Sequence, residues 1–507
     1  MWTEAQIDAL ARKSFKNKKL IIVSNRAPYQ HVHRNEKVVC VSPAGGLTSA
    51  LKPVVAAAGG TWVAQASGSA DRETACRRGR LQVPPENPAF TLRRLWVPGD
   101  LQHAYYEGLS NQALWPLCHN VYRQPVFRKS DWEAYRKVNE LFAQAVIEEA
   151  GDTDAAVFVQ DYHLALLPRI LKSRNPELTV AQFWHIPWPA YEKMRTFPWL
   201  DELIEGMLGN DLLAFHLPAH CANFVETAES TLETQTGPGQ STIWRQDHST
   251  VIRDAPISID FASHSSAAAS PEVERAMQIW KQRLGDIPSI GVGIDRIDYT
   301  KGIPERLRAL GLLLEQNPHL RGNLTFVQVG VPSRSGIAAY ADLERAIDVE
   351  VAAINKRWGT EDWKPIVFEK RNLGQVEMMA LHRLADFCMV TSLHDGMNLV
   401  AKEFVASRFD GDGVLVLSRF AGAASELRTA VPVNPFSQDS LCDAISTALT
   451  MPLIERRRRM AVARAVVQTN NIYRWAGTLI EEINELSRRP VPPKRFVHFG
   501  KLSANVA

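Results

Sequence analysis

Short apolar runs alternate with longer helical stretches along most of this 507-residue chain, and this alternation limits the possible folds more than any other feature. Runs of this kind are typical of buried strands in a parallel sheet that helices cover. The predicted strands are 20–25, 61–64, 155–161, 179–186 and 211–217, then 289–295, 324–330, 365–370, 386–392 and 414–418. Because they fall into two series, the sequence predicts an α/β protein with two doubly wound, Rossmann-like domains.

A polar, turn-rich segment at 233–250 separates the two series, and we interpret it as a surface excursion,. The domain boundary is expected shortly after it. The predicted parts are an N-terminal extension (1–18), an N-terminal domain (19–265), a C-terminal domain (266–487) and a tail (488–507). Two such domains facing one another would form a cleft at the carboxyl ends of their strands, where α/β proteins bind ligands.

Two helices are predicted from their end signals and their length. Ser130 and Glu133 have the spacing of a capping box, so a helix is expected from Ser130 to about Ala150,. A second long helix is expected over 455–487, and its initial run of arginines is interpreted as a solvated face,.

Charge and cysteine usage exclude several classes of protein. The 58 basic and 55 acidic residues give a net charge of +3, so no nucleic-acid partner is predicted,. No apolar run approaches the roughly 18–20 residues of a membrane helix, and the first twenty residues lack the apolar core of a secretion signal. Six cysteines lie far apart without a CxxC pair, which favours reduced thiols,. We therefore expect a cytoplasmic enzyme without a membrane partner.

In the second half, two loops directly after predicted strands carry residues suited to a phosphorylated ligand. GIDRIDYTKGIPERL places Arg296 and Lys301 five residues apart, beside a helix start whose free amides also attract anions,. SLHDGMNLVAKEF contributes Asp395 for sugar hydroxyls and, about one helical turn further on than Asn398, Glu403 for a ribose diol,. Each loop alone is also compatible with an ordinary turn, but their coincidence favours a ligand site.

The first half supplies polar and aromatic residues at similar positions. SNRAPY ends the first strand with Arg26, and SPAGGL is a glycine loop that permits close approach of the backbone to a ligand,. Tyr106 and Trp115 offer aromatic faces to a sugar ring, although aromatic residues are also common in cores. Asp161 and His185 each follow a strand,. The sequence contains no GxGxxG, Walker, HExxH or GxSxG motif,.

The combined order of these motifs resembles the trehalose-6-phosphate synthase family, glycosyltransferase family 20, over about residues 19–487. The motifs are SNR, AGGL, YYxxxSNxxLWP, xDYHL, HIPxP, DRxDYTKGIPER, DGMNLVAKE and SRFAGAASEL. The resemblance implies a GT-B fold and no metal or other cofactor. It also implies transfer of glucose from a nucleoside diphosphate sugar to glucose 6-phosphate with retained anomeric configuration.

The resemblance also implies roles for individual residues. The implied donor residues are Gly45, Gly46, Arg296, Lys301, Leu373, Asp395, Gly396, Met397, Asn398, Leu399, Val400, Ala401, Lys402 and Glu403. The implied acceptor residues are Arg26, Trp62, Tyr106, Trp115, Asp161 and Arg334. The implied catalytic residues are Arg296, Lys301, His185 and Asp395. His185 stands where a double displacement would need a carboxylate nucleophile, so the resemblance implies reaction on one face of the sugar.

Three differences from the family pattern cluster on the acceptor side. They are Gln160 in place of histidine, FWHIPWP in place of FLHIPFP, and the segment WVAQASGSADR. The acceptor therefore stays open between glucose 6-phosphate and glycerol 3-phosphate, which glucosylglycerol-phosphate synthases use with ADP-glucose. An enzyme that joins cyclitols and a catalytically silent sugar-phosphate sensor are further alternatives. The donor base stays open, and a homo-oligomer is possible.

Overall fold

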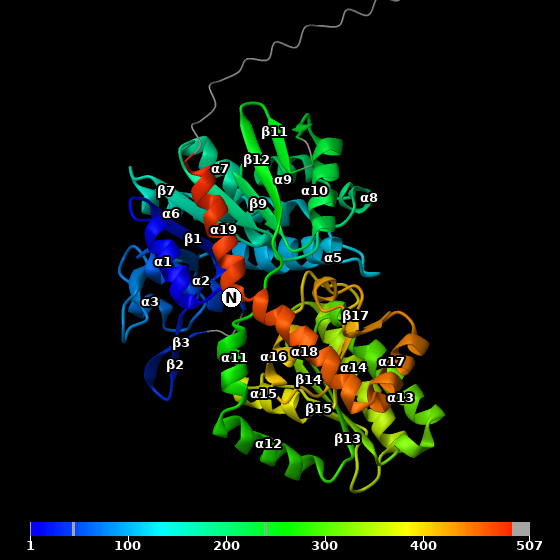
Figure 1. Ribbon diagram of the computed structural model, residues 1–507. Coiled ribbons are helices and arrows are strands. Elements are labelled where there is room, and N and C mark those ends of the chain that lie inside the picture. The colour runs from blue at the N-terminus through cyan, green and yellow to red at the C-terminus, as the bar shows by residue number, and fades with distance from the viewer. Residues whose placement is uncertain (1, 43–45, 238, 240, 489–507) are drawn as a thin grey trace, which may run out of the picture.

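Two sheets, each covered by helices, make up two lobes in the computed structural model, which describes residues 2–42, 46–237, 239 and 241–488 (Figure 1). The expectations for Gly45 and for the tail from Arg489 onward lie outside these residues. The upper lobe in Figure 1 contains the first sheet, and the lower lobe contains the second.

In the described part of the chain, the first sheet has ten strands in the order β10-β11-β12-β9-β8-β7-β1-β4-β6-β5. Pairs β5–β6, β10–β11 and β11–β12 are antiparallel, and the other pairs are parallel. The bounds are β1 (Lys19–Arg26), β4 (Thr61–Gln65), β5 (Arg80–Val83), β6 (Phe90–Leu95), β7 (Ala155–Gln160), β8 (Thr179–Phe183), β9 (Leu212–Phe215), β10 (Gln235–Thr236), β11 (Thr242–Arg245) and β12 (His248–Asp254). The central strands are apolar and buried on both faces because helices cover both sides,.

The second sheet has six parallel strands among the described residues, in the order β15-β14-β13-β16-β17-β18. The bounds are β13 (Ser289–Arg296), β14 (Leu324–Val331), β15 (Ile366–Glu369), β16 (Phe387–Val390), β17 (Val414–Ser418) and β18 (Val431–Val433). A separate hairpin, β2 (Gln30–Arg34) with β3 (Lys37–Val41), projects beside the end of β1. All ten predicted strands are therefore confirmed within a few residues.

Helices connect the strands of each sheet. Those before residue 260 are α1 (Glu4–Ser14), α2 (Gly46–Ala57), α3 (Asp71–Thr74), α4 (Gly99–Gln102), the π-helix η1 (His103–Leu114), α5 (Trp115–Cys118), α6 (Lys129–Ala150), η2 (Tyr162–Leu164), α7 (Leu167–Arg174), α8 (Tyr191–Met194), α9 (Leu200–Met207) and α10 (Pro218–Thr231). Those after it are α11 (Phe261–Ala268), α12 (Pro271–Leu284), η4 (Tyr299–Lys301), α13 (Ile303–Gln316), η5 (Pro318–Leu320), α14 (Ala338–Trp358), α15 (Gln375–Leu384), α16 (Leu399–Ser407), η6 (Gly422–Ser425), α17 (Gln438–Thr450), α18 (Leu453–Thr469) and α19 (Ile472–Leu486).

Three local predictions are wrong. The segment 233–250 is more than an excursion, because β10, β11 and the start of β12 extend the first sheet there. Helix α6 begins one residue before Ser130 and has no side-chain cap, so Ser130 lies inside the helix and cannot form the capping box,. The last helix is two helices, because Asn471 caps α19 by accepting a hydrogen bond from the amide of Arg474.

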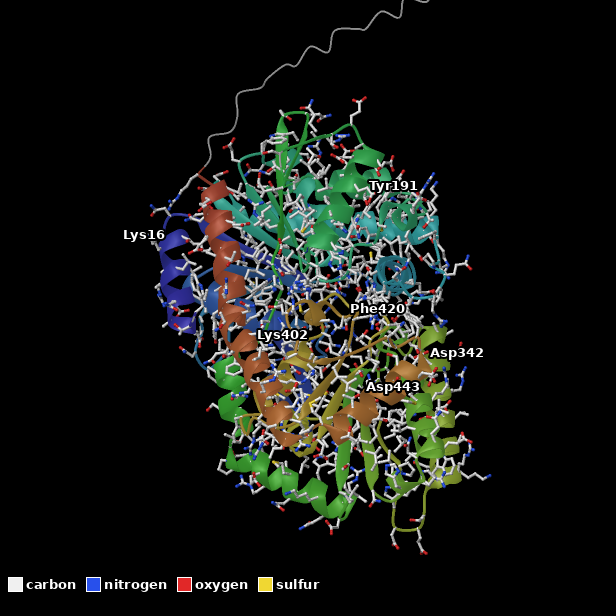
Figure 2. All side chains as sticks on the ribbon, turned by 45° about the vertical axis from the view of Figure 1, so that its right-hand side comes forward. Lys16, Tyr191, Asp342, Lys402, Phe420 and Asp443 are labelled. Atoms are coloured by element: carbon white, nitrogen blue, oxygen red, sulfur yellow. The ribbon has the colours of Figure 1, made fainter. Side chains whose placement is uncertain are left out.

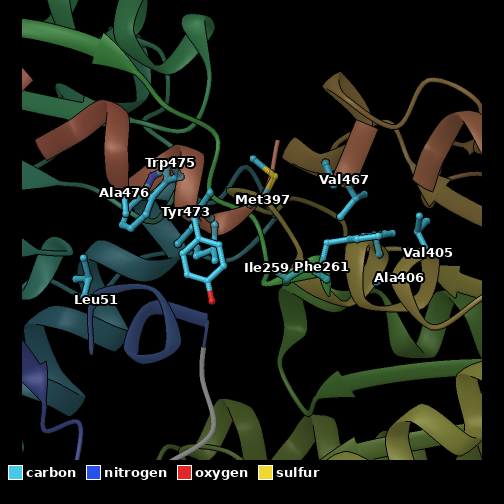
Figure 3. Close-up of a cluster of buried hydrophobic side chains, with 14 of the residues drawn as sticks. Leu51, Ile259, Phe261, Met397, Val405, Ala406, Val467, Tyr473, Trp475 and Ala476 are labelled. Atoms are coloured by element: carbon cyan, nitrogen blue, oxygen red, sulfur yellow. The ribbon is translucent and has the colours of Figure 1, made fainter. Parts of the chain in front are cut away.

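The break before α19 returns the chain to the first lobe. The amide of Ile472 donates to the carbonyl of Ile259, which pairs the two segments that cross between the lobes. Helix α19 then packs against α1, α2, β8 and β9, so the chain after residue 471 belongs with the first sheet. Figure 3 shows part of the apolar core at this crossover, to which Phe261, Met397 and Tyr473 all belong.

All six cysteines are free, as the sequence predicts. Among the described residues, no helix combines the length and apolar character needed to cross a membrane.

Candidate active site

Lys301 and Asp395 meet where two neighbouring strands of the second sheet end. After β13, the carboxylate of Asp298 caps the short helix η4, and Gly302 adopts a left-handed conformation (φ 64°) that turns the chain into α13,. This turn brings the Lys301 Nζ to 2.5 Å from the Asp395 Oδ2 in the loop after β16. The Lys301 and Asp395 side chains are 10% and 13% exposed, so the pair is shielded but not closed off.

The Asp395 carboxylate is held by a dense set of donors. Its Oδ2 also accepts hydrogen bonds from the Ser392 Oγ (3.1 Å) and the Asn398 Nδ2 (3.1 Å). Burial alone would raise the pKa of Asp395, but Lys301 and these donors hold that pKa well below its usual range,. Asp395 is therefore ionised at neutral pH and fixed in one orientation, as a residue that positions a sugar hydroxyl must be.

Arg334 contributes a second buried cation. Its Nη1 donates to the Asp298 Oδ2 (3.0 Å) and to the Tyr340 hydroxyl (2.6 Å), and its guanidinium lies 4.2 Å from the Trp115 ring centroid. Arg334 has a left-handed backbone (φ 53°), which is uncommon for a residue with a side chain and which its partners hold in place,. Because Trp115 belongs to the first lobe, this stacking joins the two lobes at the site,.

Arg26 and Tyr106 face Arg334 from the first lobe. The exposed Arg26 guanidinium donates to the Tyr106 hydroxyl (3.0 Å) at the end of β1. Burial raises the pKa of Tyr106, but Arg26 and Arg334 outweigh it and lower that pKa overall. Both cations therefore act on one phenol oxygen, and their charges converge on a single position. Such a pair of guanidiniums suits a phosphate group.

Arg296 joins the same cluster from the end of β13. Its guanidinium lies 5.5 Å from the Trp115 ring centroid, on a ring that Arg334 also contacts. Burial would raise the pKa of Asp298, but Arg334, Arg296 and Lys301 together lower it. One buried carboxylate thus faces three cations, which leaves excess positive charge for an anionic ligand.

Asp161 and His185 lie together at the ends of β7 and β8. Asp161 has a left-handed backbone (φ 72°), and its Oδ1 accepts hydrogen bonds from the amides of Tyr162 (2.9 Å) and His185 (3.2 Å). Burial raises the pKa of Asp161 to about 6, although these amides and the arginines Arg334 and Arg296 oppose the rise. Burial also lowers the pKa of His185 to about 3, so its ring is neutral.

Gln160 contacts the ring of His185. The distance between the Gln160 Oε1 and the His185 Nε2 is 3.0 Å, so the carboxamide orients the imidazole. The Gln160 Nε2 is buried and has no partner among the described residues. Gln160 is one of the sequence differences noted above, and it acts directly on a predicted catalytic residue.

Helix α16 starts directly after the Asp395 loop along the chain. Asn398 caps it from a left-handed conformation (φ 76°), with its Oδ1 accepting from the amide of Ala401. The amides of Leu399 and Val400 in the first turn are therefore available to an anion. One turn later, the Glu403 carboxylate has no protein partner in the described ranges, and burial raises its pKa to about 7. No side chain fits at Gly396, because a Cβ there would lie 2.5 Å from the His185 carbonyl oxygen.

Several predicted site residues are placed elsewhere or make other contacts. Trp62 is fully buried in β4 and donates through its indole Nε1 to the Ser24 Oγ (2.8 Å), so it has no open face for a sugar. The ammonium of Lys402 is bound to the Ile257 carbonyl and to Glu426, away from the cleft. The Met397 side chain packs in the crossover core (Figure 3). Leu373 is buried (3% exposed) in the loop after β15, and Gly46 starts α2.

Sequence reasoning missed three residues of this cluster, namely Asp298, Tyr340 and His119. Asp298 lies within the motif around Lys301 and could have been identified there. Tyr340 follows Arg334 by six residues at the start of α14, and His119 follows Trp115 by four residues, so both contacts are local, but no motif marked either residue. Burial lowers the pKa of His119 to about 3, so its ring is neutral. No group of three His, Cys, Asp or Glu side chains in the described residues is placed to hold a metal ion.

Comparison with known proteins now identifies the family. The sequence profile of glycosyltransferase family 20 matches residues 18–485. The chain belongs to glycosyltransferase family 20. It is 36% identical over 480 residues to the trehalose-6-phosphate synthase of Mycolicibacterium vanbaalenii, covering 93% of this chain and 96% of that protein. It is also 35% identical over 507 residues to the bifunctional trehalose-6-phosphate synthase/phosphatase of Thermoproteus tenax, covering 96% of this chain and 66% of that protein.

Solved structures of the family confirm the fold. A structure from E. coli bound with UDP-2-fluoro glucose has a TM-score of 0.83 at 31% identity, covering 92% of this chain and 99% of that chain. A trehalose-phosphate synthase from Burkholderia xenovorans in complex with glucose-6-phosphate has a TM-score of 0.81 at 30% identity, with 92% and 99% covered. This family 20 member therefore has the GT-B fold and is a glycosyltransferase of the trehalose-phosphate synthase type.

Proposed function

We propose that this enzyme transfers glucose from a nucleoside diphosphate glucose to glucose 6-phosphate, forming α,α-trehalose 6-phosphate. The observation that carries the proposal is the cationic cluster at the junction of the lobes. Arg26 from the first lobe and Arg334 from the second act on the Tyr106 phenol, whereas Arg296 ends β13 and Lys301, in the loop after it, pairs with Asp395. Two separate anionic groups, the acceptor phosphate and the donor diphosphate, fit this division.

In this proposal, the donor binds to the second lobe. The diphosphate contacts Arg296, Lys301 and the first-turn amides of α16, and the ribose diol contacts Glu403. Asp395, already ionised and fixed, orients the glucose hydroxyls together with the backbone of Gly396. As the bond to the leaving phosphate breaks, negative charge grows on its oxygens, and the two cations stabilise that charge more strongly than in the ground state.

The acceptor binds between the lobes. Arg26 and Arg334 hold its phosphate, Trp115 and Tyr106 contact its ring, and Asp161 accepts a hydrogen bond from a hydroxyl. His185 is neutral and lies beside the reacting carbon, where it cannot act as the carboxylate nucleophile of a double displacement,. The attacking hydroxyl therefore passes its proton to the leaving phosphate oxygen on the same face, which retains the anomeric configuration.

Relatives support this choice of substrates. The E. coli structure is bound with UDP-2-fluoro glucose, and the Burkholderia xenovorans structure holds glucose-6-phosphate. Glycerol 3-phosphate stays the second candidate acceptor, because Gln160 differs from the family pattern directly beside His185. The free thiols suit the reducing cytoplasm, where we place the enzyme,. A homo-oligomer stays a prediction.

A nucleotide-release assay on the purified enzyme tests the proposal. UDP-, ADP- and GDP-glucose are each combined with glucose 6-phosphate, glycerol 3-phosphate or no acceptor, and the products are identified by mass spectrometry. We expect nucleotide release that depends on glucose 6-phosphate, with a disaccharide phosphate formed. The donor that reacts fastest identifies the preferred base. Nucleotide release only in the presence of glycerol 3-phosphate would show that this compound, and not glucose 6-phosphate, is the acceptor. Binding of both substrates without any release would favour the sensor.

A further inference from the structure

A groove on the outer side of the Asp395 loop is not used by the proposed reaction. We call it the outer groove; it has a volume of about 440 Å³ and lies between α8 and α10 of the first lobe and residues 394–395 and 419–422 of the second. An adjoining hollow of about 430 Å³ shares Leu217, Arg419, Ala421 and Gly422 with it. Figure 2 shows Phe420, which lines the outer groove, at the junction of the two lobes below Tyr191 of α8.

The Asp395 loop separates the outer groove from the reaction site. The Asp395 carboxylate is bonded to Lys301, Ser392 and Asn398, whereas its backbone is bonded to the 419–422 loop. Its amide donates to the Phe420 carbonyl (3.1 Å), and its carbonyl accepts from the Gly422 amide (3.1 Å). One wall of the outer groove is therefore the back of the loop that presents Asp395 to the donor sugar.

The outer groove carries excess positive charge. The Lys193 Nζ contacts only backbone carbonyls, those of Pro116 (3.2 Å) and His119 (2.5 Å), among the described residues. Arg419 is exposed, and its guanidinium has no partner within the described part of the chain. Glu192 also lines the outer groove, but its side chain is 80% exposed and its carboxylate lies 3.5 Å from the guanidinium of Arg195. The charge of Asp395 is already balanced by Lys301.

Two further polar groups open into the outer groove. Helix α10 starts there without a side-chain cap or an acidic residue in its first turn, which leaves its positive end free,. His220, in that first turn, is 6% exposed and lines the groove, yet neither ring nitrogen has a partner among described atoms, and Nδ1 is fully covered. Burial lowers the pKa of His220 to about 4, so the ring is neutral. Because Nδ1 is covered, a ligand in the groove can reach only the Nε2 of His220, and a hydroxyl paired there would offset part of the cost of burying the ring,.

We propose that the outer groove is an effector site for a small phosphorylated polyol, whose phosphate binds Arg419, Lys193 and the start of α10 and whose hydroxyl binds His220. Because the groove is lined from both lobes, an occupant there bridges them and favours one arrangement of the lobes over others. It also contacts the loop that carries Asp395, so its binding and donor binding are coupled, and each must change the affinity of the other equally.

Calorimetric titration with inorganic phosphate tests the site. The titration uses the Arg26→Ala enzyme, in which the proposed acceptor phosphate site is weakened. We expect a binding event that remains in this variant and weakens at least about tenfold when Arg419→Ala is added. Adding Arg457→Ala instead is the matched control, because Arg457 is also an exposed arginine of the second lobe without a side-chain partner in the described residues. Phosphate binding that disappears with Arg26→Ala alone, or that ignores Arg419→Ala, would overturn the proposal.

A second titration tests the polyol. Ribose 5-phosphate should bind the same variant more tightly than inorganic phosphate, and His220→Phe, which keeps a ring of similar size, should remove that advantage. Equal affinities for both probes in the parent variant, or an advantage that survives His220→Phe, would overturn the role of His220. Neither titration depends on turnover. Failure of the transferase proposal and failure of the effector-site proposal are therefore distinguished by separate experiments.

Discussion

Two buried lysine–carboxylate pairs in this enzyme have similar contacts but different surroundings. Lys301 and Asp395 meet in the loops after β13 and β16, whereas Lys402 and Glu426 meet at the crossover between the lobes, where Figure 2 labels Lys402. The Nζ–O distances are almost equal, at 2.5 and 2.6 Å. Distance therefore does not distinguish the pair proposed to meet substrate from the pair that connects the lobes.

The surroundings distinguish them. Lys402 is 1% exposed and also donates to the Ile257 carbonyl (2.8 Å), while Glu426 accepts from Asn470 (3.0 Å). These contacts connect α16 to the two segments that cross between the lobes, so the pair stabilises this crossover. Lys301 is 10% exposed, and Asp395 is the one hydrogen-bond partner of its ammonium in the described residues. An ammonium has three donors, so Lys301 keeps two for a ligand.

The largest expected effect is on stability at the crossover. Lys402→Met leaves Glu426 buried without its cation, and breaking a buried pair in this way costs about 3–5 kcal/mol in unfolding free energy. Denaturant titration followed by circular dichroism measures it. The double variant Lys402→Met/Glu426→Gln should recover part of the loss. If the single variant is as stable as the parent, the pair does not stabilise the crossover between the lobes.

The matched substitution at the cleft should mainly affect the rate. Lys301→Met removes a cation proposed to stabilise the leaving phosphate, and the loss of one such contact typically lowers kcat about 10²–10³-fold. Initial rates at saturating donor and acceptor measure it. Folded Lys402→Met enzyme, assayed well below its melting temperature, should keep kcat within about tenfold of the parent. Equal rate losses in the two methionine variants would remove the distinction drawn between the pairs.

The acceptor half should respond in binding more than in rate. Arg26→Ala removes one of two guanidiniums proposed to hold the acceptor phosphate, and a hydrogen bond to a charged group is worth about 1.5–3 kcal/mol, or roughly 10–150-fold in KM for glucose 6-phosphate. Steady-state kinetics with fixed donor measure this change. Arg34→Ala is the control, because Arg34 is an exposed arginine on the nearby hairpin. A rise in the KM for the donor instead would show that Arg26 binds the donor and not the acceptor.

The smallest effect concerns pH. The pKa of Glu403 is raised to about 7 by burial, so the carboxylate gains a proton as the pH falls through that value. The protonated form is a poorer acceptor for two ribose hydroxyls, so donor affinity should fall by up to about tenfold per pH unit below pH 7. Calorimetric titration with a nucleoside diphosphate glucose, whose diphosphate does not titrate in this range, measures it between pH 6 and 8.5. The Glu403→Gln enzyme should show a flat profile; an unchanged slope would exclude Glu403 as the cause.

Sequence reasoning identified the strands and the loops that follow them, because strand burial and strand-end chemistry are local properties. It could not separate Lys301 from Lys402, since their difference depends on Ile257 and Glu426 in distant segments. It also assigned Trp62 to the acceptor, although the packing of β4 buries that ring. The outer groove depends on the approach of α10 to the 419–422 loop, about 200 residues later in the chain, and no motif marks it.

A crystal structure with both a nucleoside diphosphate and glucose 6-phosphate bound would test the division of the cleft most directly. The account predicts diphosphate oxygens within about 3 Å of Arg296 and Lys301, and the sugar phosphate within about 3 Å of Arg26 and Arg334. Lys402 should keep its contacts with Glu426 and Ile257. A sugar phosphate on Arg296 and Lys301, or a diphosphate that contacts Lys402, would contradict the account.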